Sequence, residues 1–301
     1  MIYWTRAMDK KLLEIENLHI SFPTTDGISD VVRGVSFSVG KEKVGIVGES
    51  GSGKSMTGRA ILKLNPKSAI IKAKKMCFDD IDLLSASEYQ MRTIRGKRIS
   101  MILQDPKYSL NPLIRIGDQI IEAYRIHYRV SKMDAWERTI SMLESVHIRN
   151  PEHVMRLFPH EISGGMGQRV MIAMMLIPKP DLIIADEPTS ALDITVRSQV
   201  LRVLDELVTK SGMGLIFISH DLNMIANFCD RVLVMYAGRI LEELSASDLS
   251  RACHPYTKAL LASLPRLDNP VDILAVPERD PSWLDGPTIV NGVERGCCDQ
   301  L

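Results

Sequence analysis

Long apolar runs, cysteines and an excess of charge of either sign are all scarce in this sequence. No apolar run approaches the roughly 20 residues that a membrane-spanning helix needs, and the first residues lack the apolar core of a secretory signal. The five cysteines are scattered with no CxxC pair, which favours a reducing, cytoplasmic location over a disulfide framework. Lys+Arg and Asp+Glu both number 37, so no overall basic field argues for a nucleic-acid partner.

What remains is the composition of an ordinary globular protein. Of the 301 residues, 45% are hydrophobic and 25% charged, which is typical of a soluble chain with room for one large domain or two small ones. Residues 1–7 precede the first strand-like segment, and we expect them to be a loosely ordered extension.

One stretch has the phosphate-loop pattern of Gly, four residues, Gly, Lys and then Ser or Thr. Its residues are Gly48, Glu49, Ser50, Gly51, Ser52, Gly53, Lys54 and Ser55. An apolar run over 43–47 has the length of a strand, and a helix is expected from Met56 onward. The pattern needs this strand–loop–helix context for confirmation, and a Gly/Ser turn with a stray lysine is the alternative.

The physics of such a loop is direct. Glycines let successive backbone N–H groups point inward, and the helix that follows places its positive end on a bound phosphate. In this pattern Lys54 reaches the β- and γ-phosphates and the Ser55 hydroxyl binds Mg²⁺. Met56 begins the helix and belongs to the same binding segment.

A buried strand over 182–185 ends in two carboxylates, Asp186 and Glu187. Ligands of parallel sheets gather at the carboxyl ends of the strands, where the phosphate loop also belongs. We expect Asp186 to hold the Mg²⁺ shell, and Glu187 to orient and deprotonate the attacking water. The alternative is an acidic turn before a proline.

Two further residues complete the predicted catalytic set. His220 follows the strand at 215–218, where its N–H would hydrogen-bond the γ-phosphate and the water, although a lone histidine is more often structural. Gln104 supplies a neutral amide for Mg²⁺ or the water, although a single glutamine by itself does not indicate a function.

A second glycine loop precedes another helix. Ser163, Gly164 and Gly165 lie just before an apolar helix over 170–176, and a Ser-Gly helix start is an anion site. One mononucleotide needs only one γ-phosphate cradle. The second loop therefore suggests a nucleotide held by another subunit.

Periodicity sets the predicted element order. Strands are expected at 12–22, 31–39, 43–47, 182–185, 215–218 and 232–236, with a short strand pair in 67–82 and a turn-rich break at 23–30. Helices are expected at 56–64, 87–94, 116–129, 132–146, 151–157, 196–210 and 222–228. This order predicts a parallel α/β core with a helical insertion that dominates to about residue 175.

The ordered set of motifs resembles the ATP-binding subunit of ABC transporters, over residues 12–265. Walker A corresponds to 48–55, the Q-loop to Gln104, the signature to 163–165 and Walker B to 182–187. The D-loop corresponds to 190–193 and the switch histidine to His220.

The resemblance implies an α/β fold: a P-loop NTPase core with a parallel central sheet, an antiparallel β subdomain and an inserted helical subdomain. It also implies two ATPs at the seam of a head-to-tail dimer, with Ser163 and Gly165 acting on the partner's γ-phosphate. Asp193 would tie the two sites together. Phe22 takes the place of the aromatic that stacks on adenine, although a core strand residue is nearly as good an interpretation.

Finer features look like the oligopeptide/dipeptide branch of importers. They are the segments 104–112, 158–161 and 254–261. Two departures stand out. Met166 replaces the usual signature Gln, which leaves the backbone and Ser163 donors in place, and the tail offers only Cys297 and Cys298 where relatives often carry four cysteines of an iron–sulfur cluster. We therefore expect no metal centre in the tail.

Residues 1–265 are expected to form the ATP-binding domain, with a helical subdomain at about 88–175, and 266–301 an irregular Pro-rich extension. The predicted function is ATP hydrolysis that powers import of peptides or related small solutes, with ATP and Mg²⁺ as cofactors. Predicted partners are integral-membrane permeases, a second ATP-binding subunit (self or similar) and, indirectly, a solute-binding protein, at the cytoplasmic face of the inner membrane and without nucleic acid. The alternatives are a soluble ABC-type ATPase acting on nucleic acid or ribosomes, and a P-loop small-molecule kinase.

Overall fold

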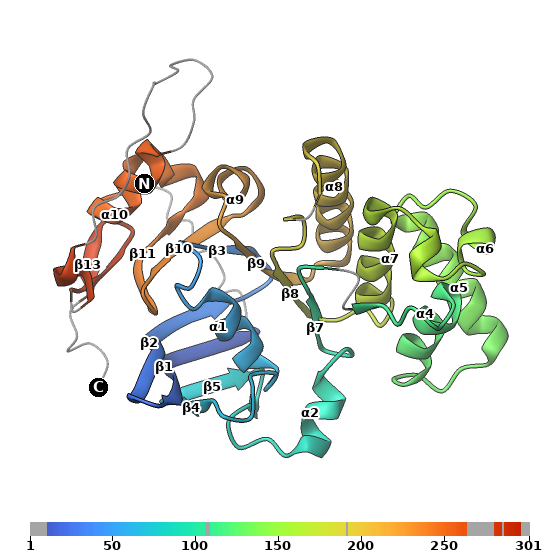
Figure 1. Cartoon of the computed structure of the whole chain (residues 1–301), viewed down its shortest axis with the longest axis horizontal. Helices are drawn as coiled ribbons and strands as arrows, with labels where there is room; N and C mark the ends of the chain where they lie inside the picture. Colours follow the sequence, from blue (N-terminus) through green and yellow to red (C-terminus); the bar gives the residue numbers. More distant parts are fainter. Residues whose placement is uncertain (1–10, 106–108, 191, 264–279, 285, 296–301) are drawn as a thin grey trace, which may run out of the picture. The chain divides into compact units, whose positions relative to one another are not determined.

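The computed structural model of the chain describes residues 11–105, 109–190, 192–263, 280–284 and 286–295 (Figure 1). It divides into two compact units. One is built from the residues up to Ser85 and from Ile216 onward, and the other from Ala86–Leu215. Each unit contains both strands and helices, so the α/β class predicted from the sequence is confirmed.

An antiparallel sheet occupies the first unit, in the order β2-β1-β5-β6 with β4 paired to β1. Its strands are β1 (Leu13–Thr24), β2 (Gly27–Val39), β4 (Ile70–Lys72), β5 (Lys75–Phe78) and β6 (Ile81–Asp82). Thr24 pairs with Gly27, so the turn between β1 and β2 is only two residues long. The break predicted at 23–30 is therefore wrong, because β1 and β2 run through most of it.

A second sheet of the first unit places β3 (Lys43–Val47) between β10 (Arg231–Tyr236) and β9 (Gly214–Ser219). β3 and β10 are parallel, and nearly all their side chains are buried, as in a sheet covered on both faces. The helices of this unit are α1 (Lys54–Ile61), α9 (Leu222–Phe228), η2 (Ala246–Arg251), α10 (Pro255–Ala262) and η3 (Pro281–Leu284).

Beyond β10 the sheet continues through strands that periodicity did not predict. They are β11 (Arg239–Ser245), β12 (Thr288–Val290) and β13 (Val293–Arg295). β12 pairs in parallel with β11 and antiparallel with β13, at the edge labelled β13 in Figure 1. Irregular structure was predicted here, and it is wrong for these two terminal strands; residues 266–279, 285 and 296–301 lie outside the described residues, as do 1–7 of the predicted N-terminal extension.

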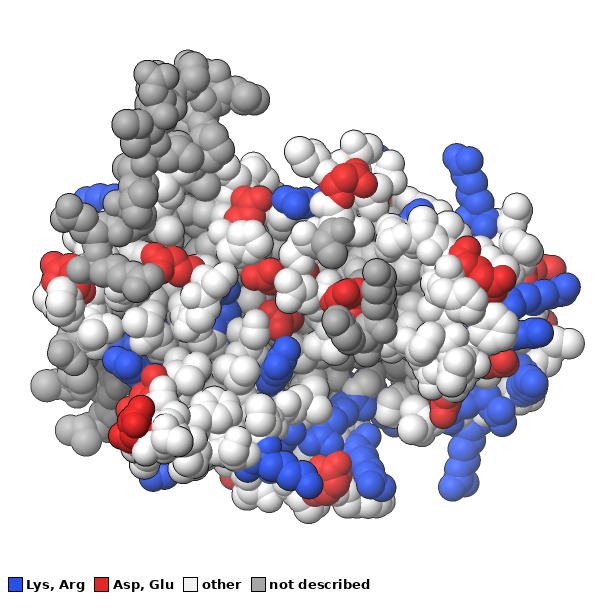
Figure 2. Space-filling view, viewed as in Figure 1, with Lys and Arg blue, Asp and Glu red and all other residues white. Residues whose placement is uncertain are grey.

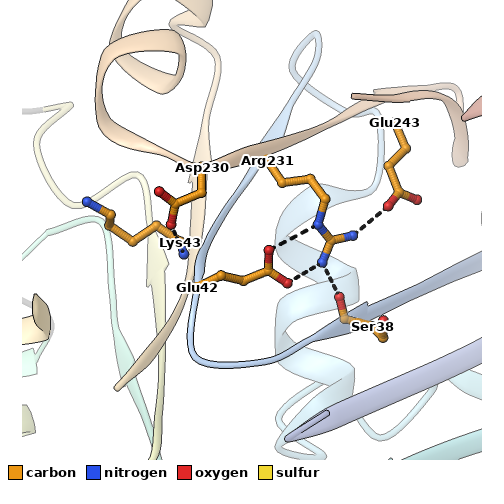
Figure 3. Close-up of polar contacts among 6 residues, drawn as sticks. All are labelled: Ser38, Glu42, Lys43, Asp230, Arg231 and Glu243. Atoms are coloured by element: carbon orange, nitrogen blue, oxygen red, sulfur yellow. Dashed lines mark hydrogen bonds and ion pairs between the residues drawn. The ribbon is translucent and has the colours of Figure 1, made fainter. Parts of the chain in front are cut away.

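Arg231 at the start of β10 joins three segments of the first unit (Figure 3). Its guanidinium donates to Glu42 at 2.7 Å, to Glu243 at 2.6 Å and to the Ser38 carbonyl oxygen. Burial by itself lowers the pKa of Arg231, but the bonds and charges of Glu42 and Glu243 outweigh it and raise the pKa. Nearby, the Lys43 N–H donates to Asp230 at 2.8 Å, so β3 and β10 are held together where both strands begin.

The second unit contains two parallel strands, β7 (Ile99–Ile102) and β8 (Leu182–Asp186), both fully buried. Its helices are α2 (Glu88–Ile94), α4 (Ile116–Arg125), α5 (Lys132–Ser145), α6 (Pro151–Val154), η1 (Pro159–Glu161), α7 (Gly164–Leu176) and α8 (Ile194–Ser211). The predicted helices are all present, although α4 and α6 end earlier than expected. β7 is a strand within the region that was predicted to be helical.

Helix starts explain why these segments form where they do. Ser87 and Ser131 each accept a hydrogen bond from the third residue of their helix, and the side chain of that residue reaches back, which is a capping box.

Among the helices of the described residues, none has the length and apolar character required to span a membrane.

Candidate functional site

The phosphate-loop residues connect β3 to α1 in the first unit, as predicted. A Cβ on Gly48 would lie 1.9 Å from the Met235 carbonyl oxygen, so only glycine fits against β10 there. Gly53 is the N-cap of α1 with φ of 98°, a backbone conformation that glycine adopts at little cost. No acidic residue lies in the first turn of α1, which leaves its positive end available to an anion.

The amine of Lys54 is wrapped by its own loop. Its Nζ donates to the carbonyl oxygens of Gly48 at 2.8 Å and Glu49 at 2.7 Å, and to the Ser52 hydroxyl at 3.3 Å. The side chain is only 5% exposed. These acceptors are neutral oxygens, and the charged oxygens of a phosphate are stronger acceptors for the same amine. The donor set therefore fits a nucleoside triphosphate.

The loop is held from behind by the turn between β10 and β11. Gly238 donates its N–H to the Ser52 carbonyl oxygen at 3.0 Å, and its own carbonyl oxygen accepts from the Arg33 N–H at 2.7 Å. These two hydrogen bonds tie the phosphate loop to this turn, and the turn to β2.

Two other predicted residues belong to the first unit. Phe22 lies near the end of β1, paired with Ser29 and half-buried, so its ring is partly available for stacking. His220 is exposed directly after β9. The next residue, Asp221, begins α9 by accepting from the Met224 N–H at 3.0 Å, which fixes the turn that holds His220.

Gln104 and Glu187 come together in the second unit. The parallel pairing of Ile102 with Ala185 places each of them two residues beyond the paired position. Gln104 Nε2 lies 3.5 Å from Glu187 Oε2. Asp186, at the end of β8, is buried with 4% exposure.

Glu187 has φ of 46°, in the left-handed region that a residue with a side chain seldom adopts. Its carbonyl oxygen accepts from both the N–H and the hydroxyl of Ser190, at 3.3 and 3.2 Å. Strained backbone of this kind is concentrated at functional sites. The following turn is fixed by Gln168, a buried residue of α7 that donates to the Pro188 carbonyl oxygen.

The signature residues lie at the start of α7. Ser163 caps this helix by accepting from the Met166 N–H at 3.4 Å, and both Ser163 and Gly164 are exposed. A Cβ on Gly164 would meet nothing within 4 Å, whereas one on Gly165 would lie 2.5 Å from Val196 of α8. Gly165 is therefore required for packing, and Gly164 leaves the helix start open to an approaching anion.

Asp193 has a local role that sequence reasoning missed. Its Oδ1 accepts from the N–H groups of Thr195 at 3.1 Å and Val196 at 3.0 Å, so it caps α8. An Asp followed by a helix is the signal that predicts such a cap. Ala191 of the D-loop and residues 106–108 of the Q-loop segment lie outside the described residues, as do Cys297 and Cys298 of the predicted cluster-free tail.

The predicted residues thus fall into two sets. The phosphate loop, Phe22 and His220 belong to the first unit, and Gln104, the signature residues, Asp186, Glu187 and Asp193 belong to the second.

Residues 32–190, more than half of the chain, match the ABC transporter family. The chain belongs to the ABC transporter family.

Relatives within this family are peptide-transport proteins by name. A probable peptide ABC transporter ATP-binding protein of Sinorhizobium fredii is 48% identical, over 84% of this chain and 77% of the relative. The dipeptide transport ATP-binding protein DppD of Bacillus subtilis is 47% identical, over 86% of this chain and 78% of the relative. The predicted resemblance to the oligopeptide/dipeptide branch is confirmed.

Solved ABC structures confirm the predicted fold. The ATP-binding cassette MJ0796, in a dimeric post-hydrolysis state bound to ADP and Pi, superposes with a TM-score of 0.69 at 25% identity, covering 78% of this chain and 98% of the cassette. This ABC chain is an ATP-binding subunit that hydrolyses ATP, as predicted. Neither the nucleic-acid ATPase nor the small-molecule kinase is favoured by these relatives.

Proposed function

We propose that this chain is one of two ATP-hydrolysing subunits that drive the import of peptides or related small solutes. The observation that carries the proposal is the presence, in one chain, of two different anion-binding helix starts. One is the Lys54 loop at α1 and the other is the Ser163 loop at α7. A chain that held its nucleotide alone would need only the first.

Binding begins at the phosphate loop. Lys54 exchanges the carbonyl oxygens of its own loop for the β- and γ-phosphate oxygens, and the N–H groups at the start of α1 face the same phosphates. The remaining loop residues, Glu49 to Gly53 and Met56, shape the cradle. Phe22 stacks on the adenine, using the part of its ring that β1 leaves exposed.

Mg²⁺ is the second cofactor of the proposal. Ser55 supplies a hydroxyl oxygen, Asp186 a carboxylate and Gln104 an amide oxygen, which is the all-oxygen donor set that Mg²⁺ prefers. When bound, this ion would neutralise charge on the phosphates as the γ-phosphoryl group passes to water.

Hydrolysis is assigned to Glu187 as the base that orients and deprotonates the water. The Gln104 amide beside it holds the carboxylate in one orientation. His220 donates a hydrogen bond to the γ-phosphate from the end of β9.

The second anion site serves a partner. Ser163 and Gly165 face the γ-phosphate of a nucleotide bound by the other ATPase subunit, and the open position beside Gly164 admits it. Met166 does not prevent this, since the Ser163 hydroxyl and the α7 N–H groups are the donors. Asp193, which caps α8, transmits the state of one site to the other.

Peptide import is inferred from the relatives' names together with the family. The proposal includes permease subunits in the membrane, a solute-binding protein beyond them, and a peripheral position on the cytoplasmic face. On the face shown in Figure 2, Lys and Arg gather at the lower edge and on the right, with some Asp and Glu among them and others nearer the centre.

The deciding experiment is dimerisation of the Glu187→Gln variant. We expect this variant with Mg-ATP to form a stable dimer, alone or with its cognate ATPase subunit, measured by size-exclusion chromatography with light scattering. The same variant with ADP is the control and should stay monomeric. A variant that remains monomeric with Mg-ATP both alone and beside the cognate subunit would refute the proposal.

The solute is tested separately. Affinity purification of this subunit from membranes should recover permease chains and a peptide-binding protein, and a strain lacking the subunit should lose uptake of labelled peptides. Recovery of ribosomes or nucleic acid instead would favour the soluble ATPase, and phosphate transferred to an added metabolite would favour the kinase.

A further inference from the structure

A helix far along the chain reaches the phosphate loop. Tyr256, in the first turn of α10, is completely buried, and its Oη accepts a hydrogen bond from the Glu49 N–H at 3.4 Å. Both residues belong to the first unit. α10 begins where His254 caps it, its Nδ1 accepting from the Tyr256 N–H at 3.1 Å, so the ring of Tyr256 starts from a fixed backbone position.

The contact falls on one particular peptide group. The carbonyl oxygen of Gly48 and the N–H of Glu49 belong to the same planar unit. Lys54 Nζ donates to that carbonyl oxygen at 2.8 Å, and Tyr256 accepts from that N–H. The plane of this peptide is therefore held from both sides. Lys54, the proposed phosphate ligand, holds one side, and Tyr256, which has no proposed contact with phosphate, holds the other.

Two rings hold Tyr256 in place. Its ring lies 4.7 Å from that of Tyr236 and 5.7 Å from that of Trp283, and Tyr236 and Trp283 are themselves 5.7 Å apart. Tyr236 ends β10, directly after Met235, whose carbonyl oxygen faces Gly48. The ring cluster thus supports both β10, which packs against the phosphate loop, and the Tyr256 hydroxyl, which accepts from the loop.

Arg239 anchors the segment that carries Trp283. Its guanidinium donates to the carbonyl oxygens of Leu284 and of Gly286, the latter at 2.8 Å. Arg239 follows Gly238, the residue whose N–H donates to the Ser52 carbonyl oxygen. Leu284 of η3 and Gly286 are therefore bound to the same turn that holds the phosphate loop.

We propose that Tyr256 is a positioning residue for nucleotide binding, and that η3 (Pro281–Leu284) braces it through Trp283. When Lys54 turns to the phosphates, it releases the Gly48 carbonyl oxygen. The Gly48–Glu49 peptide is then held by Tyr256, so the loop keeps the backbone orientation that points its other N–H groups inward. This inference rests on the proposed nucleotide site.

Tyr256→Phe tests it with little change in packing, because the ring remains and only the hydroxyl is lost. We expect the Kd for Mg-ATP, by calorimetry, to rise roughly two- to ten-fold, the loss expected for one hydrogen bond. The KM for ATP should rise with it while kcat stays within about two-fold. The thermal midpoint should stay close to that of the wild type.

The matched control is Tyr236→Phe, which removes a hydroxyl from the same ring cluster but leaves the Glu49 contact in place. It should keep the wild-type Kd. Equal affinities for the wild type and Tyr256→Phe, or equal losses in the two variants, would overturn the positioning role. Failure of the wild type to bind Mg-ATP would instead refute the proposed function itself.

Trp283→Leu tests the brace. Loss of the ring should weaken Mg-ATP binding in the same direction as Tyr256→Phe. The double variant should bind Mg-ATP about as weakly as Tyr256→Phe alone, since both changes act through one hydroxyl. Wild-type affinity in a folded Trp283→Leu protein would remove η3 from the inference.

Discussion

The amide of Gln104 lies 3.5 Å from the carboxylate of Glu187, across the carboxyl ends of the parallel strands β7 and β8. Neither residue is adjacent to the other in sequence, and β7 itself was not predicted. The pairing of the two strands is what brings the proposed water-positioning amide to the proposed base. Glu187 also has φ of 46°, and backbone strain of this kind is concentrated at functional sites.

Gln104→Ala tests this relationship. We expect kcat for ATP hydrolysis to fall roughly 10- to 100-fold, because the carboxylate loses the neighbour that orients it. The Kd for ATP should change much less, since the phosphate loop is intact. Steady-state hydrolysis and calorimetry on the same preparation separate the two effects, and a large loss of affinity with unchanged kcat would contradict the assignment.

Glu187→Gln should abolish most turnover while leaving nucleotide binding intact. Loss of a general base typically lowers the rate about 10²- to 10⁴-fold, and the amide is nearly the same size as the carboxylate. Release of phosphate in the reconstituted complex measures the loss. Glu161→Gln, a change of the same kind in η1, should retain wild-type rates; rates near wild type for Glu187→Gln would exclude it as the base.

Lys54→Ala should raise the Kd for ATP at least ten-fold, because the amine is the charged group closest to the phosphates in the proposed complex. Nucleotide titration by calorimetry measures the change. Lys67→Ala removes an exposed lysine beyond α1 and serves as the control. Since Lys54 also bonds the Gly48 and Glu49 carbonyl oxygens, circular dichroism should verify that the variant is folded.

The motifs were predictable because each is short and each local geometry follows from its residues. Glycines at 48 and 53 fit the close approach to Met235 and the left-handed N-cap, and Ser163 precedes a helix that it caps. The family resemblance then ordered these motifs correctly. Periodicity did not predict β7, since its four residues, Ile-Ser-Met-Ile, form too short a pattern to distinguish a strand from a helix.

The C-terminal strands escaped prediction for another reason. β12 and β13 are three residues each, and they exist because β11 offers an edge to pair with. The contact of Tyr256 with Glu49 joins residues 207 apart, and no local pattern encodes it. Long-range partners of this kind depend on the tertiary fold.

Arg231→Ala should destabilise the first unit by about 3–5 kcal/mol, because it leaves Glu42 and Glu243 without their shared cation. The guanidinium is 19% exposed, so solvent compensates for little of the loss. Urea unfolding followed by circular dichroism measures the free energy of unfolding. Arg251→Ala is the matched control: its pair with Asp248 is exposed, and its removal should cost less than about 1 kcal/mol. Equal costs would show that the Arg231 cluster adds no more stability than an exposed ion pair.

His254 predicts a loss of stability in acid. Burial lowers the pKa of His254, and the charge of Glu242 only partly opposes this. A histidine whose folded pKa lies below its unfolded value binds its proton more readily when unfolded. Stability is therefore constant above the unfolded pKa of about 6.5 and falls as the pH drops below it. A proton on Nδ1 would also break the cap on the Tyr256 N–H.

His254→Asn removes the titration but retains a side-chain oxygen that can cap α10. Between pH 7.5 and 5.5 the urea midpoint of the wild type should fall further than that of the variant. His127, whose pKa is also lowered by burial and by Lys97, contributes equally to both proteins, so the difference isolates His254. His160→Asn, at an exposed histidine of η1, should keep the wild-type pH dependence. α10 carries Tyr256, so the affinity for Mg-ATP should also weaken between pH 7.5 and 5.5 in the wild type. The loss should be smaller in His254→Asn. Parallel pH profiles in the two proteins would show that this cap does not respond to acid.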